Sequence, residues 1–210
     1  MNYLNWAQEK ITDHSPENIS RLYNEGFVFT RIDKGVMHQT RSVRIDLKKF
    51  SLSSENRRIL KKGEEIVIKE NTIPYLKYDW QLGKFAKDFY DKKAGGSFSV
   101  NKIKVLLTEE HNFNTLFSFS DFGYAICYKN NSILHYSYPF YDLEKASKDM
   151  GLIMMIKAIE YAQANGLQYV YLGSLQRPTD TYKLQFSGME WFDGKVWSGD
   201  MEGVKTLLRF

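Results

Sequence analysis

Cysteine is almost absent from this chain, since Cys127 is the only one among 210 residues. A single cysteine excludes a disulfide framework within the chain and any zinc or iron–sulfur site built from its cysteines. Proline is scarce as well, with four residues, and the 14 glycines follow no period, which excludes collagen-like and low-complexity chains. These scarcities indicate a globular protein of a reducing compartment, and we expect it to need no metal.

Long apolar runs are also missing, because no stretch approaches the ~20 residues that a membrane helix requires. Residues 1–10 include Glu9 and Lys10 and lack a hydrophobic signal segment. We therefore expect a cytoplasmic protein that does not bind to a membrane. Hydrophobic residues form 43% of the chain and aromatic residues 15%, which is enough for a sizeable core. The sequence predicts a single compact domain.

The net charge of +4 is unevenly distributed. Residues 41–62 carry +6, whereas the rest of the chain sums to −2. Ser53 or Ser54 can cap a helix that ends at Gly63, and bases four residues apart then share one face of it. Two interpretations stay open: a solvated helix surface, or an anion-binding face for phosphates or acidic chain ends. The bases are Arg41, Arg44, Lys48, Lys49, Arg57, Arg58, Lys61 and Lys62.

Hydrophobic periodicity and turn residues divide the chain into short elements. Helices are expected at 16–25, 54–62, 75–90 and 151–165, and strands at 27–32, 36–47, 65–69, 103–107, 115–119, 124–128, 133–140 and 168–172. The order strand, helix, strand from residue 133 to residue 172 predicts a βαβ unit with parallel strands. Gly151 stands at the start of its helix, where free backbone N–H groups suit an anion or a polarised carbonyl.

This βαβ unit follows a meandering antiparallel sheet, an order that resembles the acyltransferase fold of the GNAT superfamily. We therefore predict an α+β, GNAT-like fold with a mixed central sheet flanked by helices. Acetyl-CoA enzymes of that superfamily usually have a longer glycine signature at the helix start, with a second small residue. Ile153 stands at that second position here. Because isoleucine is too bulky for a tight pyrophosphate cradle, an acetyl-CoA-dependent N-acyltransferase of the same fold is the less favoured alternative.

Longer blocks of sequence point to a narrower family. The blocks are Arg-Ser-Val-Arg-Ile-Asp-Leu at 41–47, Asn-Arg-Arg-Ile-Leu-Lys-Lys at 56–62, Tyr-Ser-Tyr at 136–138, Phe-Tyr-Asp at 140–142, Tyr-Val-Tyr-Leu-Gly at 169–173, and Tyr182-Lys183 with Phe186. In this order, and over roughly residues 16–200, they resemble arginyl-tRNA–protein transferases and their bacterial leucyl-transferring relatives.

The chain departs from that family in its cysteines. The family has a cysteine cluster in its N-terminal half, including a Cys-x-x-Cys just before the Val-Arg strand, which binds a metal or iron–sulfur cluster. Residues 36–40 occupy this place here and contain no cysteine. Leu143 follows Asp142 where the family has a proline. The resemblance therefore points to a compact member without a metal.

The resemblance implies transfer of arginine or leucine from charged tRNA to the α-amino group of an acidic N-terminal residue, as in an N-degron pathway. Aminoacyl-tRNA is then the co-substrate, protein or peptide N-termini are the partners, and no cofactor is needed. Residues 1–72 are expected to bind substrate and tRNA, and residues 73–210 to form the acyltransferase core of the one domain. A non-catalytic relative that binds N-termini or RNA is the other alternative.

Such a transfer asks mainly for placement, because the donor ester is activated and an α-amine with a pKa of about 7.7–8.0 is partly neutral. The expected catalytic residues are Tyr138, Asp142 and Tyr171. Arginine suits the acidic N-terminal side chain, because its planar guanidinium binds a carboxylate bidentately. The expected substrate-binding residues are Arg41, Arg44, Arg57, Arg58 and Tyr136, and the expected tRNA contacts are Lys61, Lys62, Gly151, Tyr182 and Lys183.

Strand alternation makes a specific prediction for Arg44. Ser42, Arg44 and Asp46 alternate with apolar residues, so they are expected on the face opposite the core. Arg44 is then free to line a cleft, and its replacement should leave the melting temperature nearly unchanged.

Overall fold

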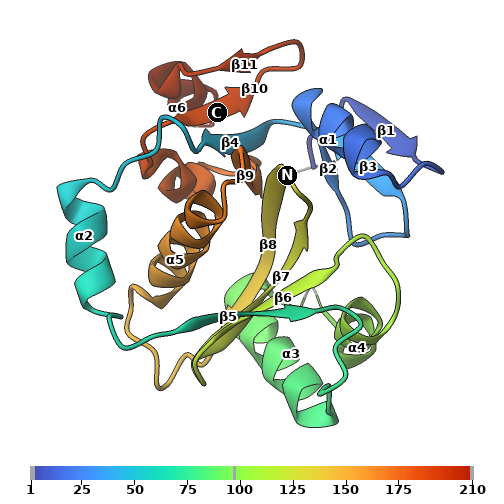
Figure 1. Cartoon of the computed structure of the whole chain (residues 1–210), viewed down its shortest axis with the longest axis vertical. Helices are drawn as coiled ribbons and strands as arrows, with labels where there is room; N and C mark the ends of the chain where they lie inside the picture. Colours follow the sequence, from blue (N-terminus) through green and yellow to red (C-terminus); the bar gives the residue numbers. More distant parts are fainter. Residues whose placement is uncertain (1–2, 97, 209–210) are drawn as a thin grey trace. The chain divides into compact units, whose positions relative to one another are not determined.

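The computed structural model describes residues 3–96 and 98–208. They form two compact units, each assembled from separate stretches of the chain (Figure 1). Unit 1 comprises residues 1–53, 130–135 and 162–210, and unit 2 comprises residues 54–129 and 136–161. Within the described residues, no helix is long and apolar enough to cross a membrane.

Unit 1 holds a small antiparallel sheet and part of a larger mixed one. The small sheet has the strand order β1-β3-β2, and the larger one runs β11-β10-β4-β9-β8. The strands are β1 (Ala7–Lys10), β2 (Phe27–Phe29), β3 (Val36–Gln39), β4 (Ser42–Asp46), β9 (Tyr169–Ser174), β10 (Met189–Phe192), β11 (Trp197–Ser198) and the first residues of β8 (Ile133–Tyr141). The helices are α1 (Pro16–Asn24), the 3-10 helix η1 (Pro178–Gln185) and α6 (Met201–Leu207).

The expected βαβ unit is present. In unit 1, β8 and β9 pair in parallel, with Ile133 opposite Tyr169 and His135 opposite Tyr171. Helix α5 (Met150–Ala164) lies between these strands in the sequence, and Gly166 follows it with a φ of +73°. The parallel pairing ends at His135 and Tyr171, and β9 continues from there to Ser174. Ligands of parallel sheets commonly bind beyond the carboxyl ends of the strands.

The single strand expected at 36–47 is wrong, because the chain divides at Thr40 and Arg41. β3 pairs with β2 in the small sheet, whereas β4 lies between β9 and β10 in the large one. The Ser42 hydroxyl donates to the carbonyl of Gly26 at 2.7 Å and fixes this change of sheet. β4 therefore has a hydrogen-bonded neighbour on each side, and four of its five residues are buried, so side chains on both of its faces are covered.

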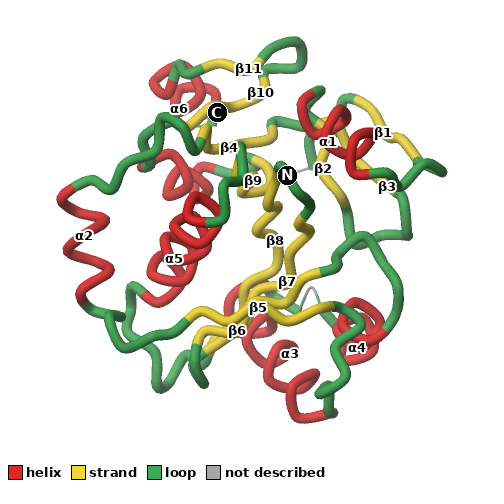
Figure 2. Tube along the Cα trace, in the orientation of Figure 1, coloured by secondary structure: helices red, strands yellow, loops and turns green. Residues whose placement is uncertain are grey.

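Unit 2 contains the other strands of the large sheet, in the order β8-β7-β6-β5. They are β5 (Ile68–Thr72), β6 (Thr115–Phe119), β7 (Gly123–Lys129) and β8 from Tyr136 onward. The helices of unit 2 are α2 (Ser54–Lys61), α3 (Trp80–Ala94), α4 (Val100–Thr108) and most of α5 (Figure 2). The pattern of helices and strands in both units confirms the expected α+β class with a mixed sheet flanked by helices.

Helices cover both faces of the unit 2 strands. Phe117 of β6 contacts Tyr161 of α5, with their ring centroids 4.9 Å apart. Tyr124 of β7 contacts Phe85 of α3 at 6.4 Å. Phe117 pairs with Ala125, the residue after Tyr124, so the two contacts lie on opposite faces of the sheet. Alternation along β6 and β7 thus explains the α–β–α layering of this unit.

The strand expected at 103–107 is wrong, because these residues belong to α4. Ser99 caps this helix by accepting a hydrogen bond from the backbone N–H of Lys102. Ile103, Leu106 and Leu107 are three to four residues apart and all fully buried, which is helical spacing. A short apolar run does not by itself distinguish a strand from a buried helix.

Candidate functional site

Lys183 places its ammonium group at the carboxyl end of β9. The residue lies on η1, and its Nζ donates to the carbonyl oxygen of Ser174 at 2.8 Å. Among the described residues no carboxylate forms an ion pair with it. Asp180 lies nearby, but its Oδ2 accepts hydrogen bonds from the backbone N–H groups of Gln176 and Arg177 at 2.8 and 2.9 Å. Burial lowers the pKa of Lys183, Arg177 lowers it further, and Asp180 opposes the change.

Gly173 leaves a space beside this ammonium group. Its φ of +76° is a left-handed conformation that glycine adopts at little cost. A Cβ at this position would lie 4.0 Å from Lys183 Nζ and 4.0 Å from His135 Nε2. The two nitrogens therefore border the same space, at the edge where β8 and β9 end their parallel pairing.

His135 is buried and neutral. Its Nδ1 and the Tyr23 hydroxyl share a hydrogen bond at 2.8 Å. Burial lowers its pKa to about 3, and the nearby charge of Lys183 adds to this effect. The sequence did not single out His135, because its position became meaningful only through the register between β8 and β9.

Arg44 is the centre of a buried polar network and not a free cleft residue, so the expectation for its surroundings is wrong. Its Nε donates to Glu190 at 2.8 Å, and its Nη1 donates to Asn24 at 3.0 Å. The guanidinium carbon lies 4.1 Å from the ring centroid of Tyr169 and 4.0 Å from that of Trp197. Two aromatic rings and a carboxylate thus hold the side chain in one position.

Tyr171, an expected catalytic residue, belongs to the same network. Its side chain is fully buried, and its hydroxyl lies 3.5 Å from Arg44 Nη1 and donates to Asn24 at 3.4 Å. Burial raises the pKa of Tyr171 to about 12, although Arg44 opposes this. At neutral pH the phenol therefore stays protonated. The structure gives it a supporting position, next to residues that hold Arg44.

Arg41 differs from Arg44 because its Nε is buried and has no hydrogen-bond partner within the described part of the chain. Its backbone is fixed by the N–H of Leu175, which donates to the Arg41 carbonyl at 2.8 Å. Burial lowers the pKa of this guanidinium, but arginine stays charged at neutral pH. An uncompensated, half-buried guanidinium is suited to an anionic ligand. Arg41 is therefore the best-supported carboxylate-binding candidate of unit 1.

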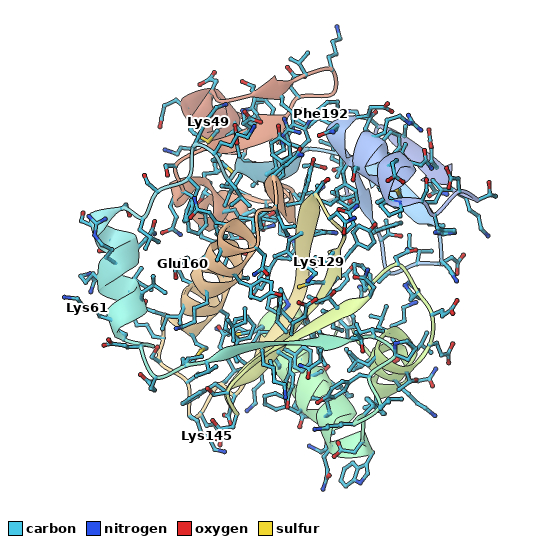
Figure 3. All side chains as sticks on the ribbon, viewed as in Figure 1. Lys49, Lys61, Lys129, Lys145, Glu160 and Phe192 are labelled. Atoms are coloured by element: carbon cyan, nitrogen blue, oxygen red, sulfur yellow. The ribbon has the colours of Figure 1, made fainter. Side chains whose placement is uncertain are left out.

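Helix α2 in unit 2 presents the remaining expected cations. Arg58 pairs with Glu55 at 2.5 Å, and Lys62 pairs with Asp149 at 2.5 Å. Arg57 is exposed on the same helix. Lys61 is exposed and points away from the helix (Figure 3), and it has no ion pair among the described residues. The two acidic partners reduce the charge that this helix offers to a ligand.

The start of α5 is less open than expected for an anion site. The backbone N–H of Gly151 donates to the Tyr141 hydroxyl, which partly offsets the rise in the pKa of Tyr141 caused by its burial. Ile153 is fully buried, and a Cβ on Gly63 would lie 2.7 Å from its Cγ2. The bulky residue at this position thus packs against the end of α2.

Asp142 forms a tight turn after β8. Its Oδ1 accepts from the backbone N–H groups of Glu144 and Lys145 at 2.9 and 3.1 Å. These hydrogen bonds hold the pKa of Asp142 below its ordinary value. A carboxylate with a lowered pKa is a weak proton acceptor, so the turn explains its position better than proton transfer does.

The other expected tyrosines lie in different surroundings. Tyr136 is buried on β8, with 3% of its surface exposed. Tyr138 contacts Phe98 and Phe113 edge-on, with centroids 5.4 and 5.2 Å apart. Tyr182 is half exposed beside Lys183, whose Nζ lies 5.9 Å from its ring centroid. Tyr182 thus lies next to the Lys183 ammonium within unit 1.

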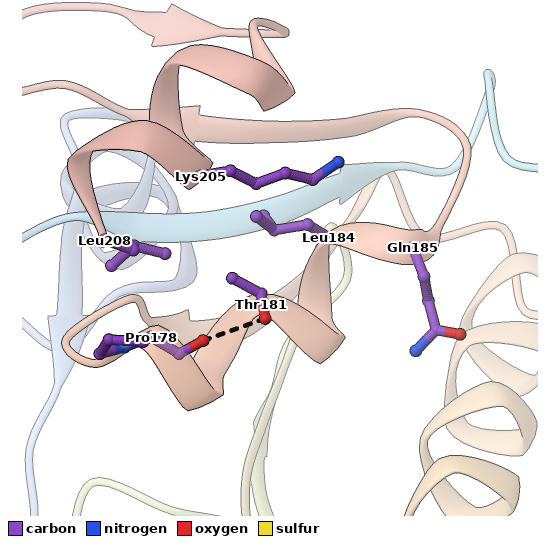
Figure 4. Close-up of a pocket in the computed structure, with 6 residues that line it drawn as sticks. All are labelled: Pro178, Thr181, Leu184, Gln185, Lys205 and Leu208. Atoms are coloured by element: carbon purple, nitrogen blue, oxygen red, sulfur yellow. Dashed lines mark hydrogen bonds between the residues drawn. The ribbon is translucent and has the colours of Figure 1, made fainter.

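A separate pocket of about 480 Å³ lies between η1 and α6 in unit 1 (Figure 4). It is lined by Pro178, Thr181, Leu184, Gln185, Lys205 and Leu208. Its one lysine, Lys205, pairs with Glu202 at 2.7 Å. Lys183, which lies on the same 3-10 helix, is not among the lining residues. This pocket therefore does not belong to the candidate site at the end of β9.

The chain is similar in sequence to bacterial proteins named aspartate/glutamate leucyltransferase. An aspartate/glutamate leucyltransferase of Dinoroseobacter shibae is 27% identical over 183 residues, which are 77% of this chain and 64% of that protein. One from Cereibacter sphaeroides is 25% identical over 171 residues, 74% of this chain and 60% of the relative. The chain thus spans less than two thirds of the length of these relatives.

Solved structures show looser likeness. L-PGS from Bacillus licheniformis aligns with 92% of this chain and 70% of its own, at a TM-score of 0.49 and 10% identity. A GCN5-related glucosamine N-acetyltransferase region of a fungal multi-domain beta-N-acetylglucosaminidase aligns with 90% of this chain and 23% of its own, at a TM-score of 0.45 and 11% identity. Likeness at this level does not bear on function.

The family of the chain is shown by its sequence and not by these solved structures. Residues 89–193, half of the chain, match the family described as arginine-tRNA-protein transferase, C terminus. This range holds β9 with its glycine, the whole of η1, and Lys183. The chain therefore belongs to the arginine-tRNA-protein transferase family, through the C-terminal region of that family.

Proposed function

We propose that this protein transfers an aminoacyl group from charged tRNA to the α-amino group at the N-terminus of a protein or peptide. The observation that supports this most is the match of residues 89–193 to the family's C-terminal region. That region contains the polar group of residues at Gly173 and Lys183, just beyond the parallel pairing of β8 and β9. Function follows from a site and not from a fold alone, so the proposal depends on these residues.

The residues of this polar group suit the reaction. An aminoacyl ester needs no strong nucleophile, because a neutral α-amine attacks it readily once the two are held together. Lys183, His135 and the space beside Gly173 supply a polar lining of amine and imidazole nitrogens. Electrostatic stabilisation of the developing oxyanion then adds to placement.

The substrate class follows from charge. Arg41 offers a guanidinium whose Nε has no partner within the described residues, and a carboxylate matches its geometry. We propose that Arg41 contacts the side chain of an N-terminal Asp or Glu, which places the protein in an N-degron pathway. The amino acid transferred is arginine or leucine. The family is named for arginine, whereas the curated relatives are leucyltransferases.

The test is a transfer assay with two donors and matched acceptors. The chain is incubated with Arg-tRNA or Leu-tRNA and with peptides that begin with Asp, Glu or Lys, and the peptide mass is followed. We expect a gain of one arginyl or leucyl residue on the Asp and Glu peptides. Acetyl-CoA is offered in a parallel reaction.

Each outcome decides between defined alternatives. A gain of one acetyl group, with none from either charged tRNA, would establish the acetyl-CoA-dependent alternative. Binding of tRNA or peptide without any mass gain would indicate a non-catalytic binding module. An Arg41→Gln variant should lose the preference for acidic over Lys-starting peptides. An Arg21→Gln variant, changed at an exposed helix position, should keep that preference.

A further inference from the structure

We propose that Lys183 is the catalytic proton acceptor of this aminoacyl transfer. Its Nζ takes the proton that the attacking α-amino group must lose, and it returns a proton to the tRNA oxygen that leaves. This inference rests on the proposed function and gives the reaction a general base and acid. It replaces the simpler expectation that Lys183 only contacts the acceptor end of tRNA.

The Lys183 ammonium group is held in a fixed position beside Gly173. Nζ lies at the carboxyl end of β9, fixed by one hydrogen bond to the Ser174 carbonyl at 2.8 Å. In the space beside Gly173, a Cβ built on that residue would lie 4.0 Å from Nζ, which is an ordinary van der Waals distance. A reacting group that enters this space meets Nζ without displacing any side chain of residue 173.

Lys183 has no carboxylate counter-ion among the described residues. Within the described part of the chain, no carboxylate lies within ion-pair distance of Lys183, and Asp180 is committed to two backbone N–H groups. Lys183 is partly buried, and a charge withdrawn from water without a carboxylate partner is costly. The lack of a carboxylate partner shifts the equilibrium of Lys183 toward the neutral amine, which is the form that accepts a proton.

The charged and titratable groups that face Lys183 agree with this. Burial lowers its pKa most, the carboxylate of Asp180 opposes this change, and the charge of Arg177 lowers the pKa further. His135 borders the same space but is neutral. Tyr182 presents its ring face at 5.9 Å. An amine whose pKa moves down from its ordinary value toward the working pH becomes an efficient base.

The other candidate groups are poorer bases. The pKa of His135, at about 3, makes its imidazole too weak to take a proton from an ammonium ion. The pKa of Tyr171, at about 12, keeps its phenol protonated and unable to accept. Asp142 is held as a carboxylate by turn hydrogen bonds that lower its pKa. Of these four groups in the described part of the chain, Lys183 combines basicity with the lack of a counter-ion.

Aminoacyl transfer through Lys183 moves one proton from the amine to the leaving tRNA oxygen. The neutral α-amine nitrogen attacks the ester carbonyl carbon, a C–N bond forms, and the carbonyl electron pair moves to oxygen. The nitrogen then loses one proton to the neutral Nζ. When the tetrahedral intermediate collapses, the bond from carbon to the ribose oxygen breaks, and the Lys183 ammonium gives its proton to that oxygen. Lys183 ends in its starting form.

The test compares two substitutions that separate base catalysis from charge. Lys183→Arg keeps a positive charge but cannot accept a proton near neutral pH, and Lys183→Ala removes both properties. We expect both to lower kcat by about 10²–10⁴-fold with little change in KM for tRNA. Both should lose the rise of kcat with pH that reports the amine. Small primary amines in the buffer should partly restore kcat of Lys183→Ala and not of Lys183→Arg.

The control is Lys205→Ala, which changes a surface lysine of the same unit and should leave kcat unchanged. If Lys183→Arg keeps wild-type kcat, and Lys183→Ala mainly raises KM for tRNA, then Lys183 is a phosphate-binding cation and the proposal is wrong. Loss of activity with a lower melting temperature, without amine rescue, would also overturn it in favour of a structural role. If the unchanged chain transfers nothing from any charged tRNA, the proposed function itself fails.

Discussion

Replacing Arg44 with glutamine tests the buried network most severely. The substitution removes the partner of Glu190, whose side chain is 18% exposed, and empties the space between the rings of Tyr169 and Trp197. Breaking a fully buried pair costs about 3–5 kcal/mol. The loss is smaller here, because Lys49 still contacts Glu190 at 3.2 Å. Adding the lost ring contacts, at about 0.5–2 kcal/mol each, we expect the free energy of unfolding to fall by about 3 kcal/mol.

For a chain of this length, each kcal/mol corresponds to about 2–4 °C in the melting temperature. Thermal unfolding of Arg44→Gln, followed by circular dichroism, should therefore show a decrease of about 6–12 °C. The matched control is Arg21→Gln, because Arg21 pairs with Glu25 at 2.7 Å but is 57% exposed. An exposed pair of this kind contributes about 0.3–0.5 kcal/mol, so the control should melt almost as the wild type. Equal melting temperatures for the two variants would refute the assignment of Arg44 to a stabilising network.

Three further predictions address pH, charge and backbone. The pKa of His135 is near 6.5 when the chain is unfolded and about 3 when it is folded, so the free energy of unfolding should fall as the pH drops through this window. In His135→Gln, the free energy of unfolding measured with urea should depend less on pH in this window. A pH dependence equal to that of the wild type would contradict the burial of a neutral His135. Lys61→Ser should reduce the salt dependence of tRNA binding by about 0.9 in slope if Lys61 contacts a phosphate, whereas an equal slope would exclude that contact. Gly26→Ala should destabilise the chain by about 1–3 kcal/mol more than Gly166→Ala, as measured by urea unfolding. Both glycines have positive φ, but only at Gly26 would a Cβ lie 2.2 Å from the ring of Phe192, and equal losses would disprove the clash.

The sequence predicted the parts of the fold that depend on local pattern. Ser15 and Pro16 begin α1 as expected, because a capping hydroxyl and a first-turn proline act on their immediate neighbours. The parallel pairing of β8 and β9 follows from the order of the elements around α5. The α4 segment shows the limit of such patterns, since its short apolar run is equally compatible with a strand.

The surroundings of the site residues could not be predicted, because their partners are distant in sequence. Alternation along β4 gave Arg44 a polar face, but Glu190 of β10, 146 residues away, covers that face. Residues 189–192 carry no strong strand pattern in the sequence, so the central place of β4 in the sheet could not be foreseen. In the same way, Lys183 was singled out by its motif, whereas its approach to His135 depends on the register of two strands.

The most direct test of the central claim follows one labelled aminoacyl group in a single turnover. An excess of the chain is mixed with tRNA charged with labelled arginine or leucine and a peptide that begins with Asp, and samples are taken over time. The account predicts that label leaves the tRNA and enters the peptide at equal rates, as an amide on the α-amino group located by tandem mass spectrometry. Label that stays on both tRNAs, or reaches the peptide only at lysine side chains, would contradict the account.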